Sequence, residues 1–367
     1  MLRPKIKNEH RPVRHGEDRV RIGGMVVGIA ADMPDPDGRV WALLETLDGS
    51  RTVDQVVADL VHRFPGEPAE RVRADIDALV RAGYVEDAAE RPPDALSAAE
   101  RERYGRGRAL LRWMDRVPRQ TSWDTQLLLR EARVVVIGVG GAGGVAALAL
   151  AVSGVGRLHC VDPDVVELSN LNRQILFTEH DVGRRKVDAA LDRLRAHNTA
   201  ITVTGEELTI DGPAALHRLA ADADVLVVTA DRPAEIRSWA NQACHATGTK
   251  WVHGGYHGPQ VTIGLYRPGS GPCYDCARIT EQRRLAGLPP RTPWKSSADT
   301  VHQPANAVTA GIAGYRVAHA VMSLITGVPA LAANRQYGLN LVTLEHAYAL
   351  APDAPDPDCP TCRPASR

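Results

Sequence analysis

Apolar residues recur at two alternating periods through the middle and later parts of the chain. Between residues 133 and 256, short apolar runs typical of buried strands alternate with segments whose apolar residues repeat at helical spacing. The pattern predicts strands at 133–138, 157–162, 201–208, 225–230 and 251–256, and helices at 143–153, 186–197, 213–223 and 233–247. This alternation predicts an α/β fold with a Rossmann-like, doubly wound, mainly parallel sheet.

The front of the chain shows a different pattern. Two short β-rich runs, 20–22 and 25–29, flank Gly23-Gly24 and indicate a hairpin. Helical spacing then predicts three helices, at 39–47, 53–64 and 68–83. Three helices edged by small strands resemble a winged helix. A polar stretch from residue 86 to about 102, which contains Arg91-Pro92-Pro93, predicts a linker.

Composition narrows the class of protein. The 367 residues are 44% hydrophobic and 24% charged, which is typical of an ordinary globular protein. Lys and Arg together number 44, and so do Asp and Glu, so no basic excess favours a nucleic-acid partner. No run approaches the about 18 apolar residues of a membrane span. The first fourteen residues are polar and basic, unlike a secretory signal. We therefore expect a cytoplasmic protein without a membrane partner.

A glycine-rich segment carries the clearest chemical signal. The strand at 133–138 runs into a loop and then into an apolar helix, and the loop contains Gly138, Gly140, Gly141, Ala142 and Gly143. Glycines let the backbone approach a phosphate, and the start of the helix supplies free N–H groups. Asp162 follows at the end of the next strand, where a carboxylate suits a ribose hydroxyl. Taken alone, this segment fits NAD, FAD or ATP, and hence a dehydrogenase, or a tight turn without a ligand.

The residues that follow resemble one family. Residues 162–174 include Asn170-Leu171-Asn172-Arg173-Gln174, residues 182–187 resemble a G-x-x-K-V element, and Asp231 follows Thr229-Ala230. Together with the glycine loop, residues from about 100 to 367 resemble the ThiF/MoeB/HesA adenylyltransferases, which are similar to ubiquitin-activating enzymes. Two positions depart from the family pattern, Val228 and Arg232.

The resemblance implies roles for residues at the nucleotide. It implies phosphate contacts from Arg173 and Lys186, a magnesium ligand at Asp231, and further ATP contacts from Asp162, Asp164, Asn170 and Gln174. Carboxylate oxygen is a ligand that magnesium prefers. The activity implied is adenylation of a carboxylate by ATP and Mg²⁺, in which the protein supplies positioning and charge.

Each assignment has a structural alternative. Lys186 could be a solvated lysine in the first turn of its helix. Arg173 could pair with Asp162 or Asp164. Asp231 could cap a helix that Pro233 starts.

The family also takes an arginine finger from the partner subunit. Arg103-Tyr104-Gly105-Arg106 resembles its R-Y-x-R element, which makes Arg106 the candidate and implies a homodimer. Arg101 and Arg108 crowd the same segment, so a purely structural role for Arg106 stays open.

Four of the six cysteines form two C-x-x-C pairs, Cys273/Cys276 and Cys359/Cys362. Four thiolates at this spacing suit a tetrahedral, structural zinc ion, and the pairs match the family's zinc ligands. A redox dithiol is the alternative. Cys160 and Cys244 lie in a predicted strand and a predicted helix, where cysteine is most often a small core residue.

The segment that holds the catalytic cysteine of ubiquitin-activating enzymes has no cysteine here. Between residues 277 and 310 the chain offers basic and polar residues instead, at Arg283, Arg284, Arg291, Lys295, His302 and Asn306. We therefore expect no thioester on this protein. The basic segment could cover the substrate or be a solvated lid.

The front region resembles the PqqD-like domains that bind leader peptides in the biosynthesis of ribosomally made, modified peptides. The resemblance rests on Arg21-Ile22-Gly23-Gly24, on residues 47–52 and on the three helices. It implies that a leader adds a strand to the small sheet against the third helix. A plain winged-helix packing domain or a DNA reader is the alternative, although the balanced charge of the helix at 68–83 counts against DNA.

Three functions follow as hypotheses. The first is adenylation of a carboxylate on a precursor peptide, as in relatives such as microcin C adenylating enzymes, with a downstream modifying enzyme as a further partner. The second is a non-catalytic protein that presents the leader to a cyclodehydratase. The third is activation of a sulfur-carrier protein. The expected divisions are a leader-binding domain at 1–90, a linker and helix at 91–124 and an adenylation domain at 125–367.

Overall fold

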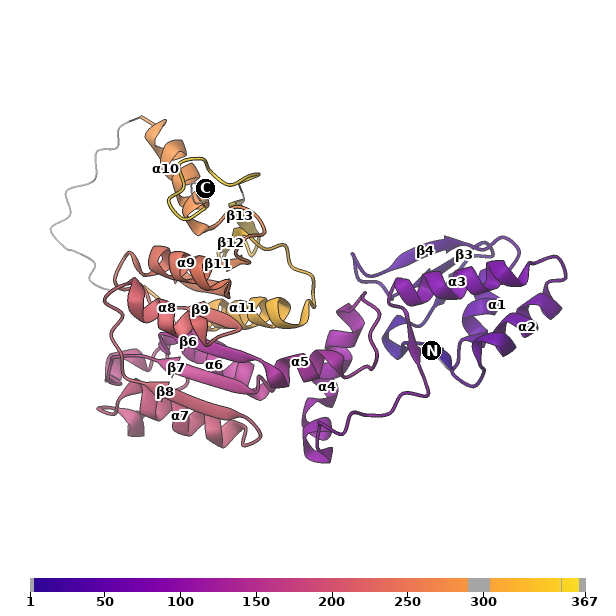
Figure 1. The fold of residues 1–367 in the computed structure, drawn as a ribbon, viewed down its shortest axis with the longest axis horizontal. Helices are drawn as coiled ribbons and strands as arrows, with labels where there is room; N and C mark the ends of the chain where they lie inside the picture. The colour runs from indigo at the N-terminus through magenta and orange to yellow at the C-terminus, as the bar shows by residue number, and fades with distance from the viewer. Residues whose placement is uncertain (1–2, 290–303, 351, 363–367) are drawn as a thin grey trace. The chain divides into compact units, whose positions relative to one another are not determined.

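The computed structural model describes residues 3–289, 304–350 and 352–362. The chain divides into two compact units, Met1–Leu127 and Leu128–Arg367, coloured along the sequence in Figure 1. Each unit has its own hydrophobic core, so the two are described separately.

The first unit combines short strands with helices. Its elements are β1 (Pro4–Ile6), the one-turn helix η1 (Asn8–His10), β2 (Val13–His15), β3 (Arg19–Ile22), β4 (Ala31–Pro34), α1 (Arg39–Thr46), α2 (Val53–Arg63), α3 (Ala69–Arg81), β5 (Val85–Asp87) and α4 (Ala98–Met114). β2, β3 and β4 form an antiparallel sheet, and β1 pairs with β5. Apolar faces of the three helices share one core with β3, as the 3.6-residue spacing predicts.

Two sequence-based boundaries in this unit are wrong. Residues 25–29 form turns rather than a strand, and β3 pairs instead with β4, which starts at Ala31. The positive φ of Gly23, Gly24 and Gly28 explains why the apolar run between them bends. The supposed linker at 86–102 contains part of β5 and the start of α4, where Ser97 and Glu100 form a capping box.

The helix α4 is tied to the front of the first unit by charged contacts. Arg112 forms ion pairs with Glu9 and with Glu86, the latter at 2.7 Å. The Lys7 ammonium donates to the Asp115 carbonyl at 3.0 Å. These side chains are buried or nearly so, and breaking one pair would leave a poorly solvated charge.

The second unit is built on an eight-stranded sheet in the order β13-β12-β11-β10-β9-β6-β7-β8. Its strands are β6 (Arg133–Ile137), β7 (Arg157–Val161), β8 (Thr202–Glu206), β9 (Val225–Val228), β10 (Lys250–His257), β11 (Gln260–Tyr266), β12 (Arg335–Asn340) and β13 (His346–Leu350). The five strands from β8 to β10 are parallel, and β11 to β13 continue the sheet in antiparallel fashion. The predicted mainly parallel α/β sheet is confirmed.

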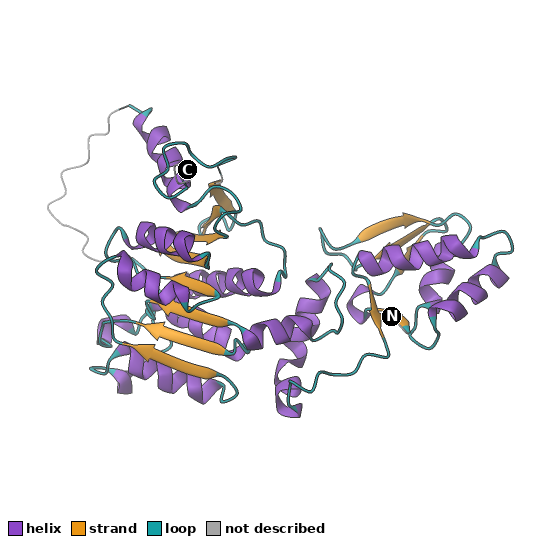
Figure 2. Ribbon diagram, viewed as in Figure 1, coloured by secondary structure: helices purple, strands orange, loops and turns teal. Residues whose placement is uncertain are grey.

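Helices cover both faces of this sheet (Figure 2). On one side α6 (Gly141–Val152), α7 (Lys186–His197) and α11 (Ala307–Thr326) pack against the strands, and on the other α8 (Pro213–Ala221) and α9 (Ile236–Thr247) do so. α5 (Asp124–Glu131) precedes β6, and α10 (Tyr274–Ala286) follows β11. The strand order reverses between β6 and β9, and doubly wound folds bind ligands outside the carboxyl ends of the strands at such a point.

The helix α11 corrects one expectation from composition. Its 20 residues are long and apolar enough to cross a membrane, although no such run was expected. However, 61% of its most apolar window is buried, and it packs along α6 and β10. These contacts are typical of a core helix.

Candidate nucleotide site and four-cysteine cluster

The glycine loop lies at the topological switch point. β6 ends at Ile137, and α6 starts at Gly141 with Gly140 as its N-cap and no side-chain cap. Gly138 has φ +85°, and a Cβ there would lie 2.8 Å from the backbone nitrogen of Ala230 in the loop after β9. A Cβ at Gly143 would lie 1.8 Å from the Gly138 carbonyl oxygen. Only glycine fits these two positions, and the N–H groups at the start of α6 remain available to an anion.

Asp162 fixes the shape of this loop. Its carboxylate accepts hydrogen bonds from the backbone N–H of Val139 at 2.8 Å and of Asp164 at 3.0 Å. Burial raises the pKa of Asp162, and the charge of Lys186 opposes that rise. Both carboxylate oxygens are already engaged, whereas the side chain of Asp164 is 63% exposed.

Lys186 is the first residue of α7 and is 6% exposed. Its ammonium pairs with the Asp164 carboxylate at 2.7 Å. The alternative of a solvated lysine is therefore wrong. The pair places the Lys186 ammonium beside the Asp164 carboxylate at the carboxyl edge of the sheet.

Arg173 and Gln174 follow the short helix η2 (Leu168–Asn170). The Arg173 guanidinium donates to the Ser169 carbonyl and to Asn172 Oδ1, both at 3.0 Å, rather than to Asp162 or Asp164. The alternative of a structural pair with either aspartate is therefore wrong.

Gln174 is 4% exposed, and its Nε2 lies 3.6 Å from the point where a Cβ on Gly140 would be. Its Oε1 is buried without a hydrogen-bond partner among the described residues. Asn170, which is 7% exposed, accepts from the Glu167 backbone N–H at 3.2 Å and so shapes the same segment. A buried orphan oxygen is costly, and a hydrogen-bond donor, such as a ribose hydroxyl, or a metal ion would satisfy it.

Asp231 follows β9 and is exposed. α9 starts at Ile236 with Glu235 as its N-cap, so the alternative in which Asp231 caps this helix is wrong. The Asp231 carboxylate is close enough to Tyr256 to affect the pKa of that phenol.

Tyr256 is a site residue that the sequence motifs missed. A Cβ on Gly141 would lie 3.2 Å from its hydroxyl oxygen. Burial raises the pKa of Tyr256, while the charge of Arg173 and a hydrogen bond from it lower that pKa. The structure thus brings the glycine loop, Arg173, Asp231 and Tyr256 together.

Arg106 belongs to the first unit, whereas these residues belong to the second. It is exposed on α4, in the first unit, and makes no ion pair or hydrogen bond with any described residue. By contrast, Arg108 lies over the Trp123 ring at 4.6 Å, and Arg101 donates to the Leu96 carbonyl at 2.6 Å. Arg106 as the finger residue stays a prediction.

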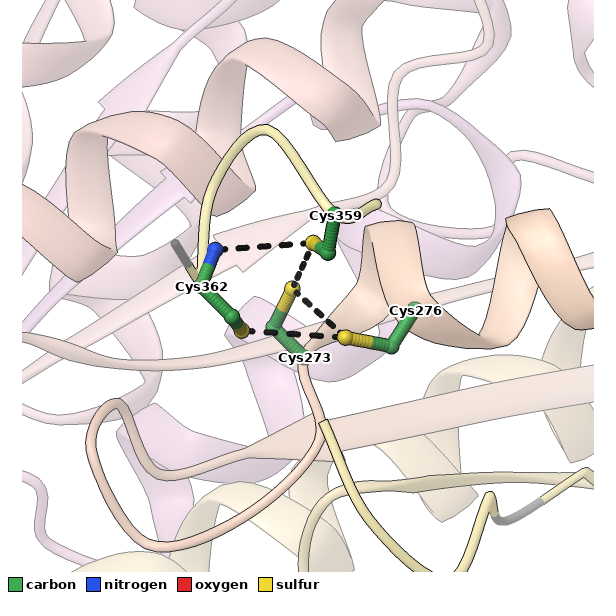
Figure 3. A group of neighbouring side chains, drawn as sticks. All are labelled: Cys273, Cys276, Cys359 and Cys362. Carbon is green, nitrogen blue, oxygen red and sulfur yellow. Dashed lines mark hydrogen bonds between the residues drawn. The ribbon is translucent and has the colours of Figure 1, made fainter. Parts of the chain in front are cut away.

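The four cysteines of the two C-x-x-C pairs converge (Figure 3). All four sulfurs lie within 4.8 Å of one another, and the closest contacts are 3.5 Å for Cys273–Cys359, 3.7 Å for Cys276–Cys362 and 3.8 Å for Cys273–Cys276. Sulfurs at the corners of a tetrahedron, about 2.3 Å from a central zinc ion, lie about 3.8 Å apart. The residues therefore fit a zinc ion, and all six cysteines are free of disulfides.

Buried polar contacts support this cluster. Asn241 on α9 donates to Cys273 Sγ at 3.2 Å and to the Asp275 carboxylate at 2.9 Å. Asp275, which is 1% exposed, also accepts from Ser238 at 2.9 Å and from Thr361 at 2.7 Å. Such contacts hold metal ligands in place and tie the tail, α9 and α10 into one structure.

The basic segment after residue 277 is partly helical. Arg283 and Arg284 lie on α10, where Arg283 pairs with Asp356 and Asp358 and Arg284 pairs with Glu281. Asn306 caps α11 by accepting from the Thr309 backbone N–H. These residues have structural partners, and Arg291, Lys295 and His302 lie outside the described residues.

A glycine loop, a buried lysine and an exposed aspartate at the switch point of a doubly wound sheet define a nucleotide-binding protein. Residues 115–361 match the ThiF family, and residues 38–82 match coenzyme PQQ synthesis protein D (PqqD). The first match spans well over half of the chain. This protein therefore belongs to the ThiF family and is an adenylyltransferase of the ubiquitin-activating type.

Sequence relatives agree with this class. Over 184 residues the chain is 37% identical to molybdopterin-synthase adenylyltransferase of Escherichia coli (strain K12), covering 49% of this chain and 69% of that protein. Over 154 residues it is 40% identical to sulfur carrier protein ThiS adenylyltransferase of Bacillus subtilis (strain 168), covering 41% and 45% respectively.

Solved structures share the fold over nearly the whole chain. E. coli MccB with ATP has a TM-score of 0.75 at 22% identity, over 98% of this chain and 99% of that chain. PaaA has a TM-score of 0.68 at 24% identity, over 94% and 98%. At these identities the likeness shows the fold alone.

Proposed function

We propose that this protein uses ATP and Mg²⁺ to adenylate a carboxylate on a ribosomally made precursor peptide and releases pyrophosphate. One observation carries the proposal. A nucleotide crevice with its charged residues in place shares a chain with a segment that matches PqqD. A protein that only presents a leader has no need of the buried Lys186 or of the orphan oxygen of Gln174.

The front domain supplies the peptide-binding part of the proposal. β2 and β4 are the two edges of the three-stranded sheet, and Met33 of β4 shares a core with Val72 and Ile76 of α3. A leader segment that adds a strand to the β4 edge would gain backbone hydrogen bonds there. MccB, which shares the fold, has been solved with MccA and with N-formylated MccA.

The proposed reaction is a single displacement. A carboxylate oxygen of the peptide attacks the α-phosphorus of ATP, the bond to the pyrophosphate oxygen breaks, and pyrophosphate leaves with its electron pair. Lys186 and Arg173 would neutralise charge on the phosphates, and Asp231 would hold the magnesium ion. Asp164 suits the ribose better than Asp162 because it is exposed and has a free oxygen.

The acyl group is proposed to reach its acceptor without a thioester on this protein. Cys160 and Cys244 are both fully buried, and burial raises the pKa of both thiols, that of Cys160 to about 12. Thiols of this kind form little of the reactive thiolate at neutral pH. A partner's nucleophile or a group on the peptide would then attack the adenylate.

Three further parts of the proposal concern assembly. The four cysteines would hold a structural zinc ion whose closed shell leaves no position for catalysis. Arg106 would act in the site of a second subunit, which makes the functional unit a homodimer. The leader-binding part would span residues 1–90, the helix with Arg106 residues 91–124 and the adenylation part residues 125–367.

A sulfur-carrier adenylyltransferase is the second candidate, because the relative at 40% identity, sulfur carrier protein ThiS adenylyltransferase, carries that activity in its name. Its substrate would be a small protein that ends in Gly-Gly. The front segment that matches PqqD favours the peptide.

Pyrophosphate exchange separates the two candidates. The full-length protein, with ATP and Mg²⁺, should return labelled pyrophosphate into ATP only when a peptide encoded by a neighbouring gene is added. Carrier proteins ending in Gly-Gly serve as the alternative substrates, and Lys186→Met is the inactive control. Exchange with a carrier alone would establish the second candidate, and exchange with neither substrate contradicts both.

A further inference from the structure

Tyr256 occupies a part of the sheet that reaches beyond its parallel neighbours. The last parallel pair between β10 and β9 is His253 with Val228, so residues 254–257 extend past the carboxyl end of β9. In this stretch β10 pairs only with β11, where Tyr256 faces Val261. The tyrosine therefore lies beside the crevice in which doubly wound folds bind their ligands.

Packing fixes the ring of Tyr256 near the start of α6. The ring contacts a small apolar cluster that includes Ala142, Val261 and Ala313. Its hydroxyl oxygen lies next to Gly141, the first residue of α6, whose helix start has no side-chain cap. Free N–H groups at the start of a helix favour a bound anion, and the Tyr256 hydroxyl lies beside these groups.

The hydrogen-bond roles at Tyr256 leave one hydrogen unused. The guanidinium of Arg173 lowers the pKa of the phenol, and because a guanidinium can only donate, any hydrogen bond between the two uses the phenol oxygen as the acceptor. The Tyr256 hydroxyl donates no hydrogen bond to any described residue. Because burial raises the pKa of Tyr256, the group stays protonated at neutral pH and keeps this hydrogen.

We propose that Tyr256 donates a hydrogen bond to an oxyanion at the reacting centre. That oxyanion is either the α-phosphate of ATP or the carboxylate of the substrate, which share the chemistry of a negatively charged oxygen acceptor. The proposal rests on the proposed function and adds a residue that orients one reactant beside Gly141. A phenol that only supported Arg173 would make no contact with either reactant.

The test removes the hydroxyl and reads each reactant separately. Tyr256→Phe keeps the ring, and Tyr337→Phe is the matched control, because the Tyr337 hydroxyl bonds to the Ala332 carbonyl in another part of the sheet. Calorimetry with α,β-methylene ATP and Mg²⁺ measures nucleotide binding, and pyrophosphate exchange measures KM for the peptide. One of the two should weaken about tenfold, as for loss of a hydrogen bond to a charged group. A change below twofold in both overturns the proposal.

A double-mutant cycle separates direct contact from support of Arg173. In an Arg173→Ala background, Tyr256→Phe should still weaken the same reactant about tenfold. No effect in that background means that Tyr256 acts only through Arg173, which overturns the proposal. The calorimetric measurement needs no peptide, so a wild-type protein that binds the analogue without catalysing exchange would contradict the proposed function and leave the tyrosine testable.

Discussion

Two sites of the second unit, the nucleotide crevice and the four-cysteine cluster, differ in how complete they are without a ligand. In the cluster, buried donors such as Asn241 contact the sulfurs or their neighbour Asp275. In the crevice, Lys186 and Arg173 bond to neighbouring side chains, and an oxygen of Gln174 has no partner among the described residues.

This difference teaches how each site relates to stability. A closed metal cluster ties chain segments together, so its contacts favour the folded state directly. An open crevice keeps charged and polar groups ready for a ligand, and some of them cost stability until the ligand arrives. Substitutions in the cluster should therefore affect mainly the stability of the fold, and substitutions in the crevice should affect mainly activity.

The largest effect is expected at Lys186. Lys186→Met removes the buried cation beside Asp164 and should lower the rate of pyrophosphate exchange by about 10²–10³-fold, as for loss of one preorganised charge. Arg185→Met is the matched control, since Arg185 is exposed and pairs with Glu207 at 3.0 Å. It should change the rate less than twofold. Full exchange activity in Lys186→Met would remove this residue from the phosphate site.

The next effect concerns the cluster and should appear mainly in stability. Cys276→Ser replaces one buried thiolate with a poor zinc ligand, so bound zinc measured by mass spectrometry should fall well below one ion per chain. The free energy of unfolding should fall by roughly 3 kcal/mol, or about 10 °C in Tm. Cys244→Ala, a core cysteine outside the cluster, should keep its zinc. Unchanged zinc content in Cys276→Ser would rule out a four-thiolate site.

The smallest effect tests the cost of the open site. Gln174→Met keeps the size of the side chain and removes the orphan oxygen, so the ligand-free protein should become more stable by up to about 1 kcal/mol. Binding of α,β-methylene ATP should weaken a few-fold in the same variant. Thermal melts with and without the analogue measure both changes. If stability and binding both fell, the glutamine would be part of the folded framework and not of the open site.

The regular elements between residues 133 and 256 were largely predictable. The helix at Lys186–His197 starts and ends where helical spacing places it, and the ends of the predicted strands differ from the observed ones by at most two residues. Such elements are determined locally, by the spacing of apolar residues and by the residues at the turns between them. The run at 25–29 was predicted wrongly because it is apolar but exposed, and the glycines around it set the backbone.

The candidate site was predictable only in part. The glycine loop, Lys186 and the four cysteines carry recognisable spacing, and the structure brings the cysteines together. Tyr256 and Asn241 belong to no motif, because sheet register and helix packing bring them to their sites across long stretches of sequence. A tyrosine after Gly254-Gly255, at the carboxyl end of a predicted parallel strand, was the available signal for Tyr256.

The bond from Val139 N–H to Asp162 has a consequence for the speed of ATP binding. The loop is already held in shape by Asp162, the residue after β7, so its conformational entropy is lost during folding and not during association. Association should then proceed in one step, without a slow rearrangement of the loop, so its observed rate should rise in proportion to the ATP concentration. Differences in nucleotide affinity among variants of this loop should accordingly appear as differences in residence time.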